Sequence, residues 1–188
     1  MKVKRIGFML LLTAAGVSAQ TAPTPTSLPK ATVVQTAEIK AAVQRNGTGA
    51  FSDSVLRLLP IEASYNVGVS VVRRSQVHGR TPPDAIVHDA ITEVYQITEG
   101  KGVLVTGGVV ESATPLPADD PDVRQQIGPS SVGKVIRGGT RQNVGPGDIV
   151  VIPPHTAHGF VEITTKRIIY TLIRIDPQRL LEPRGEAR

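Results

Sequence analysis

The 188-residue chain is long enough for one domain with a full core and too short for two large ones. It contains no Cys, which excludes disulfides, thiolate metal sites and Cys nucleophiles. It has no basic run and few aromatic side chains to stack on bases, so the composition argues against nucleic-acid binding.

The first 19 residues have the pattern of an export signal. Basic residues at positions 2, 4 and 5 precede an apolar segment at 6–12, and Val17-Ser18-Ala19 fits a cleavage site before Gln20. The apolar segment is too short to span a bilayer, and no later segment predicts a transmembrane helix. We therefore expect an exported protein, periplasmic or secreted. Its remaining 18 basic and 16 acidic residues leave a net charge of +2.

One short helix is predicted before the strands. Residues 20–29 are rich in Thr, Pro and Ala and indicate a linker. Thr36 can cap a helix from Ala37 to about Arg45, with Glu38 in its first turn and Asn46-Gly47 after its end. We assign residues 20–50 to this linker and helix.

From residue 54 onward the pattern favours strands, predicted at 55–59, 65–73, 93–98, 102–110, 134–136, 148–152 and 167–175. Residues 112–133, rich in Pro, Asp and Ser, predict a loop with a helical turn near 121–126. No helical pattern alternates with the strands, which disfavours a parallel α/β sheet. The fold class is therefore mainly β, an antiparallel sandwich or barrel over residues 51–180, followed by a tail at 181–188.

Two segments, 88–100 and 147–158, each join a Val/Ile-rich strand to a turn and carry good metal ligands. His88 and Glu93 lie in the first segment, and His158 lies in the second. Two imidazoles and a carboxylate, without a thiol, suit a divalent transition metal held with open coordination positions.

In these segments the chain resembles the cupin superfamily, small double-stranded β-barrels that include the germins. His88, Glu93 and Gly100 match the second half of the first cupin motif. Gly147, Pro153 and His158 fall in register with the second motif. The resemblance covers roughly residues 65–176. It implies a jelly-roll barrel of antiparallel strands (a double-stranded β-helix) that binds a metal through the two histidines and the glutamate.

The chain departs from the cupin motifs at three positions. Ile86 stands where the first motif has its first histidine, His155 replaces a glycine of the second motif, and Glu162 replaces its closing asparagine. Two alternatives follow for a metal such as Fe, Mn, Zn or Ni. The site has three protein ligands, or another residue such as His78 completes it. We expect the His155 side chain to be exposed in its turn.

Two further residues are candidates for the site. Strand alternation places Tyr95 on the face of Glu93, where it is either a hydrogen-bond donor and proton shuttle or a core aromatic. Arg73 and Arg74 point to opposite faces of one strand. Arg73 shares the face of Val71 and is predicted to look toward the barrel mouth and bind an anionic substrate group, or to be solvated.

Three functions are compatible with these residues. The first is a metal-dependent enzyme, an oxidoreductase, isomerase or lyase, acting on a small organic molecule. The second is a non-catalytic small-molecule-binding cupin in which Ile86 marks a degenerate metal site. The third is a metal-free isomerase or sugar-modifying cupin that uses a His and a Tyr as acid and base. A homodimer through exposed sheet edges or the N-terminal arm is also predicted.

Overall fold

The computed structural model describes residues 30–45, 49–77, 85–134 and 136–183. The predicted export signal, most of the linker, Asn46-Gly47 and His78 lie outside these ranges. The chain divides into two units, Met1–Val33 and Val34–Arg188. Every helix and strand in the described ranges belongs to the second unit, and none of these helices is long and apolar enough to cross a membrane.

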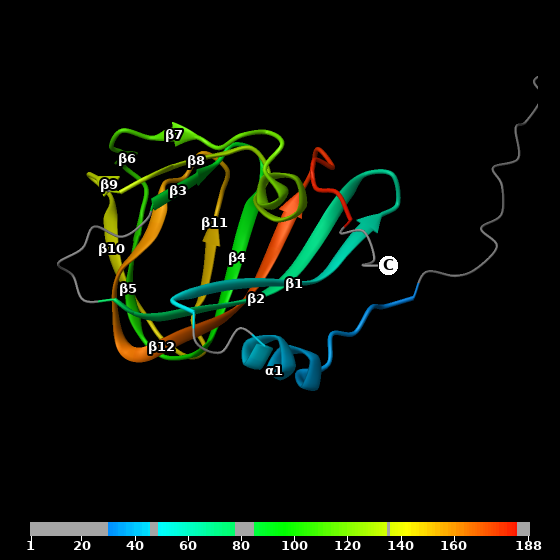
Figure 1. Ribbon diagram of the computed structural model, residues 1–188, viewed down its shortest axis with the longest axis horizontal. Coiled ribbons are helices and arrows are strands. Elements are labelled where there is room, and N and C mark those ends of the chain that lie inside the picture. The colour runs from blue at the N-terminus through cyan, green and yellow to red at the C-terminus, as the bar shows by residue number, and fades with distance from the viewer. Residues whose placement is uncertain (1–29, 46–48, 78–84, 135, 184–188) are drawn as a thin grey trace, which may run out of the picture. The chain divides into compact units, whose positions relative to one another are not determined.

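The second unit is built mainly from antiparallel strands, as predicted (Figure 1). Its elements are α1 (Thr36–Arg45), β1 (Phe51–Ile61), β2 (Tyr65–Val77), β3 (Ala85–His88), β4 (Thr92–Glu99), β5 (Gly102–Thr106), β6 (Val109–Val110), β7 (Thr114–Pro115), η1 (Val123–Ile127), β8 (Ser130–Gly133), β9 (Ile136–Arg137), β10 (Thr140–Val144), β11 (Ile149–Ile152) and β12 (His158–Asp176).

Strand β12 is the centre of the ten-stranded sheet. Its N-terminal part pairs with β3 and β5, and its C-terminal part pairs with β2 and β4. In Figure 1 this strand, drawn in orange to red, bends between the two sets of partners. β1 and β11 extend one set, and β7, β8 and β10 extend the other. Within the described ranges the two sets do not close on each other, so the barrel is open.

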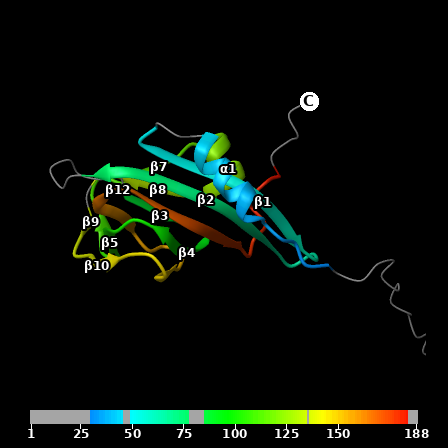
Figure 2. The ribbon, with the colours of Figure 1, turned by 90° about the horizontal axis from the view of Figure 1, so that it is seen from below.

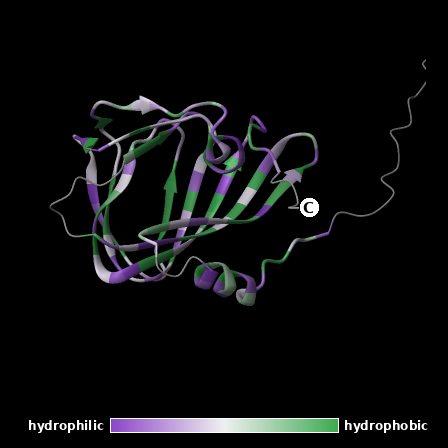
Figure 3. Ribbon diagram, in the orientation of Figure 1, coloured by the Kyte–Doolittle hydropathy of each residue, from purple (hydrophilic) through white to green (hydrophobic). Residues whose placement is uncertain are grey.

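Apolar and polar residues alternate along the strands (Figure 3). The apolar side chains therefore share one face, and the core lies on that face. Its principal cluster contains Val72, Tyr95, Ile97, Leu104, Val144, Ile152, Phe160, Ile163, Ile168, Tyr170 and Leu172. In β12 the buried even-numbered positions continue past Leu172 to Arg174 and Asp176, which are also buried. Two charged residues therefore occupy the apolar face of the longest strand.

Helix α1 packs outside the sheet against β1 and β2 (Figures 1 and 2). Ala42 is fully buried beside Val71 and Ile169. The helix begins one residue earlier than predicted, because the side chain of Glu38 accepts a hydrogen bond from the backbone N–H of Gln35 at 3.1 Å. This contact belongs to the capping-box arrangement and makes Gln35, rather than Thr36, the capping residue.

Several strand predictions need correction. β3, β8 and β10 were not predicted, since they are short and lack a clear apolar alternation. The predicted strand at 102–110 is interrupted at Gly107 and Gly108, which have positive φ angles of 77° and 70°. The predicted loop at 112–133 contains β7, β8 and the π-helix η1, which lies close to the expected helical turn.

The two motif glycines occupy backbone positions that favour glycine. Gly100 and Gly147 have φ angles of 82° and 96°. At Gly100 an added Cβ would lie only 2.0 Å from the carbonyl oxygen of Arg167, whereas at Gly147 it would meet no atom within 4 Å. His155, at the glycine position of the second motif, also has a left-handed φ of 60°. Residue 155 therefore has a backbone conformation that favours glycine, although the residue is a histidine.

Candidate metal centre

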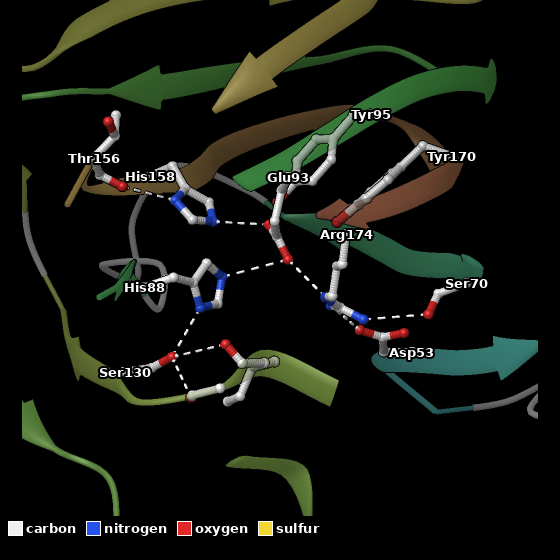
Figure 4. Close-up of polar contacts among 12 residues, drawn as sticks. Asp53, Ser70, His88, Glu93, Tyr95, Ser130, Thr156, His158, Tyr170 and Arg174 are labelled. Carbon is white, nitrogen blue, oxygen red and sulfur yellow. Dashed lines mark hydrogen bonds and ion pairs between the residues drawn. The ribbon is translucent and has the colours of Figure 1, made fainter. Parts of the chain in front are cut away.

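The three predicted ligands come from three strands and meet inside the barrel (Figure 4). His88 ends β3, Glu93 lies near the start of β4, and His158 begins β12. The backbone N–H of His155 donates to the carbonyl oxygen of His88 at 2.7 Å. This hydrogen bond holds the turn that precedes His158 against the end of β3. The three side chains are 2–4% exposed.

The distances between the ligand atoms fit a shared ion. His88 Nε2 lies 3.4 Å from Glu93 Oε1, and His158 Nε2 lies 3.3 Å from Glu93 Oε2. All three ligand atoms lie within 4.8 Å of one another. Two atoms bound to one zinc-like ion at its usual bond lengths are about 3 to 3.5 Å apart. The two histidine–carboxylate distances match this range, so the group has the spacing to hold a metal.

Hydrogen bonds at Nδ1 fix the tautomers of both histidines. The Nδ1 of His158 lies 3.0 Å from the carbonyl oxygen of Thr156, which can only accept, so this nitrogen carries a proton. The Nδ1 of His88 lies 2.8 Å from Ser130 Oγ, whose own proton is donated to the carbonyl oxygen of Gly128 at 2.8 Å. Each imidazole, when neutral, therefore directs its Nε2 lone pair toward Glu93.

This arrangement requires a positive charge between the three groups. The Nε2 atom of His158 is buried and has no hydrogen-bond partner among the described residues. Two lone pairs that face an ionised carboxylate repel it, unless a metal ion or protons on the imidazoles lie between them. A hydrogen bond from Nδ1 to an oxygen is also the usual way in which proteins orient metal-binding histidines. The donor set therefore fits a divalent metal.

Glu93 is held in its charged form. Burial alone would raise the pKa of its carboxyl group. Without a metal, protons on the imidazoles take the place of the cation, and the positive charge at His88 and Arg174 together with hydrogen bonds from those protons holds that pKa well below its usual range. Arg174 Nε donates to Oε1 at 3.0 Å, and the Tyr95 hydroxyl donates to Oε2 at 2.7 Å. Each carboxylate oxygen thus has its own donor, and the carboxylate cannot rotate freely.

Tyr95 is a core aromatic that also donates a hydrogen bond. Its ring stacks on Tyr170 with centroids 4.4 Å apart. Burial, together with the negative charge of Glu93, raises the pKa of the Tyr95 hydroxyl well above its usual value. The phenol therefore keeps its proton and orients the carboxylate.

Arg73 is not brought to the three ligands. Its guanidinium donates to the carbonyl oxygen of Gly49 at 2.5 Å and to Ser75 Oγ at 3.4 Å. The face of β2 that carries Val71 is covered by α1. The apolar alternation around Arg73 therefore reflects packing of β2 against the helix, outside the barrel core. Arg74 lies on the other face, where it donates to the Tyr170 hydroxyl at 3.1 Å.

The sequence did not identify the residues that support the ligands. Arg174, Asp53 and Ser130 each bond to a ligand or to a residue that holds one. Arg174 had a detectable signal, because it continues the buried positions of Tyr170 and Leu172 in β12. Asp53 and Ser130 lie in segments without a motif, and only the folded chain brings them near the site.

The structure describes the positions of Ile86 and His155, two of the residues that depart from the cupin motifs. Ile86 lies directly opposite His158 in the pairing of β3 with β12, so both residues face the same side of the sheet. The His155 side chain is exposed, as expected. Among the described residues, only His88, Glu93 and His158 form a group with metal-binding geometry.

No protein-family model and no curated protein matches the chain. Similar solved structures include a proposed sugar phosphate isomerase from Acidithiobacillus ferrooxidans (13% identity, TM-score 0.42), covering 76% of this chain and 74% of that one. Another is KdgF from Halomonas sp. (14%, TM-score 0.38; 69% and 81% covered). A third is the cupin domain of Cnp3 from Schizosaccharomyces pombe (8%, TM-score 0.41; 70% and 67% covered).

The chain has a mainly antiparallel β fold, as the sequence predicts. Two sets of antiparallel strands share β12, and the two motif segments meet at one end of the fold. The fold presents two imidazoles and one carboxylate to a common point in its interior.

Proposed function

We propose that the chain is an exported cupin that binds a divalent metal through His88, Glu93 and His158, and that it acts as a metal-dependent enzyme on a small organic molecule. One observation carries the metal assignment. Both histidines are fixed as Nδ1–H tautomers, so their Nε2 lone pairs converge on an ionised carboxylate. A divalent cation satisfies all three groups.

The metal and the protein have separate tasks in this proposal. When bound, the ion supplies Lewis acidity or a binding position for a small molecule or oxygen, since three protein ligands leave coordination positions open. Ser130 and Thr156 orient the imidazoles, and Tyr95 with Arg174 orients the carboxylate. Burial of these groups excludes water and strengthens their electrostatic interactions.

Calorimetric titration of chelator-treated protein with Mn²⁺, Ni²⁺ and Zn²⁺ tests the metal assignment. We expect one site per chain for at least one of these ions, and no binding by His158→Ala. His155→Asn is the matched control, because His155 is exposed and Asn tolerates its positive φ. Wild-type protein that binds none of these ions, and no Fe²⁺ under anaerobic conditions, would exclude a metal centre.

A second function is favoured by Ile86. An aliphatic side chain beside His158 leaves the site one ligand short of the cupin motif and makes its surroundings more apolar. The chain would then be a small-molecule-binding protein without catalysis. Screening small organic molecules against wild-type protein and a His88→Ala/His158→Ala variant separates the two functions. Binding that is unchanged in the variant favours the binding protein, and a turnover lost in the variant favours the enzyme.

Export is proposed from the N-terminal pattern alone. Expression of the full chain in a bacterial host, followed by fractionation and N-terminal sequencing, tests it. We expect the protein in the periplasm or medium with Gln20 as its first residue. Cytoplasmic protein that retains residues 1–19 would contradict export and leave the metal assignment unaffected.

A further inference from the structure

A buried row of alternating charges lies behind the carboxylate of Glu93 (Figure 4). Arg174 Nε donates to Glu93 Oε1 at 3.0 Å, and Arg174 Nη2 donates to Asp53 Oδ2 at 2.5 Å. Arg174 Nη1 also donates a hydrogen bond to an uncharged group, Ser70 Oγ, at 3.2 Å. The row runs from β4 through β12 to β1, with negative, positive and negative charge in turn.

Asp53 is directed at this arginine. The side chains of Arg174 and Asp53 are 4% and 9% exposed, so solvent screens their interaction only weakly. The other carboxylate oxygen of Asp53, Oδ1, has no hydrogen-bond partner within the described part of the chain. Gly68 lies opposite Arg174, and an added Cβ there would approach the Arg174 Cβ to 3.3 Å. The local packing therefore leaves room for the arginine.

The charge on Arg174 opposes metal binding, while its position supports it. A guanidinium is always charged, and at 3.0 Å from Oε1 it withdraws negative charge from the atom that would face the metal. The same hydrogen bond fixes the rotation of the carboxylate. The negative charge of Asp53 offsets the withdrawal of charge from Oε1. It leaves the orientation of the carboxylate by Arg174 unchanged.

We propose that the Asp53–Arg174 pair sets how tightly Glu93 binds the metal. Arg174 positions the carboxylate, and Asp53 neutralises the arginine so that the carboxylate keeps its strength as a ligand. This inference rests on the proposed metal site and adds two positioning residues to it. Hydrogen-bonded groups behind metal ligands commonly change metal affinity by about 10- to 100-fold.

Asp53→Asn tests the pair with a change of charge at nearly constant shape. We expect the dissociation constant for Zn²⁺ to rise about 10- to 100-fold, with a changed visible spectrum of the Co²⁺-loaded protein. Ser70→Ala is the control, because it removes a neutral partner of the same guanidinium and should leave the Zn²⁺ affinity unchanged. A role confined to stability would lower the unfolding midpoint of metal-free Asp53→Asn without changing its Zn²⁺ affinity, and that result would overturn the proposal.

The double variant Asp53→Asn/Arg174→Gln removes both charges together. It leaves no unpaired buried charge of the pair, so it remains informative if Asp53→Asn does not fold. We expect its Zn²⁺ affinity to stay within about 10-fold of the wild type, because no unbalanced charge remains although the hydrogen bond from Arg174 to Glu93 is lost, and a larger loss would overturn the proposal. Wild-type protein that binds no metal would instead reject the proposed function itself, so the two failures are distinguishable.

Discussion

At the scale of single residues, Ser130 decides which nitrogen of His88 faces the metal. Its hydroxyl accepts the Nδ1 proton because its own proton is donated to the Gly128 carbonyl. Ser130→Ala removes this acceptor, and the ring then loses its fixed tautomer. We expect metal affinity to fall about 10- to 100-fold in calorimetric titration. Ser131→Ala, on the opposite face of β8, should bind as the wild type does, and equal losses in both variants would contradict this role.

The charge of Glu93 predicts how stability depends on pH. Its pKa in the folded protein lies well below the ordinary value of 4.5, so its contribution to stability is complete above pH 4.5. That contribution is lost as the pH falls from there through the folded-state pKa. In the presence of a chelator, we expect the free energy of unfolding measured with urea to decrease below pH 4.5. The decrease should be smaller in Glu93→Gln, and parallel curves for the two proteins would refute the assignment.

Ile86 offers a test by gain of function. It lies opposite His158 on the face that carries the ligands, so a histidine at position 86 can reach the metal. We expect Ile86→His to bind Ni²⁺ or Zn²⁺ more tightly than the wild type in the same titration. Val87→His points to the other face and serves as the control. Tighter binding by both variants would show that position 86 has no special relation to the site.

At the scale of elements, the turn between β4 and β5 depends on Gly100. Alanine there combines a positive φ with a Cβ placed 2.0 Å from a carbonyl oxygen. Gly147→Ala carries the same kind of backbone strain without a clash. We expect Gly147→Ala to lower the free energy of unfolding by about 1–2 kcal/mol, and Gly100→Ala to lower it by more than about 3 kcal/mol. Similar losses, measured by urea unfolding, would contradict the steric argument.

The sequence predicts elements well where periodicity is strong. The helix was predicted to within one residue, and the apolar alternation located β2, β4 and β11. β10 was missed because four of its five residues are exposed, so no apolar alternation marks it. The position of Arg73 was predicted wrongly. Alternation shows which residues share a face of a strand, but not which face lies in the interior. The face of β2 that carries Val71 and Arg73 is covered by α1, not by the core.

Only the three candidate ligands of the site could be predicted from the sequence. Motif spacing brings out His88, Glu93 and His158, and the structure places them together. Asp53 reaches Arg174 across 121 positions of sequence, a contact that no local pattern contains. Supporting residues of this kind depend on how the two sets of strands share β12, and that arrangement is a property of the folded chain.

At the scale of the whole molecule, the site connects elements that are distant in sequence. β12 carries His158 at its start and Arg174 near its end, while β3, β4 and β1 supply the remaining groups. Unfolding of β3, β4 or β12 would take the ligands apart. A metal bound here should therefore stabilise the folded domain as a whole, by about 2.7 kcal/mol when the free ion is at 100 times its dissociation constant.

Urea unfolding with and without the metal tests the central claim most directly. The measurement uses wild-type protein, His155→Asn and His158→Ala, each treated with chelator and then supplied with the ion that binds. We predict that the metal raises the unfolding midpoint of the wild type and of His155→Asn, and leaves that of His158→Ala unchanged. An equal rise in all three proteins, or no rise in the wild type, would contradict a metal centre at His88, Glu93 and His158.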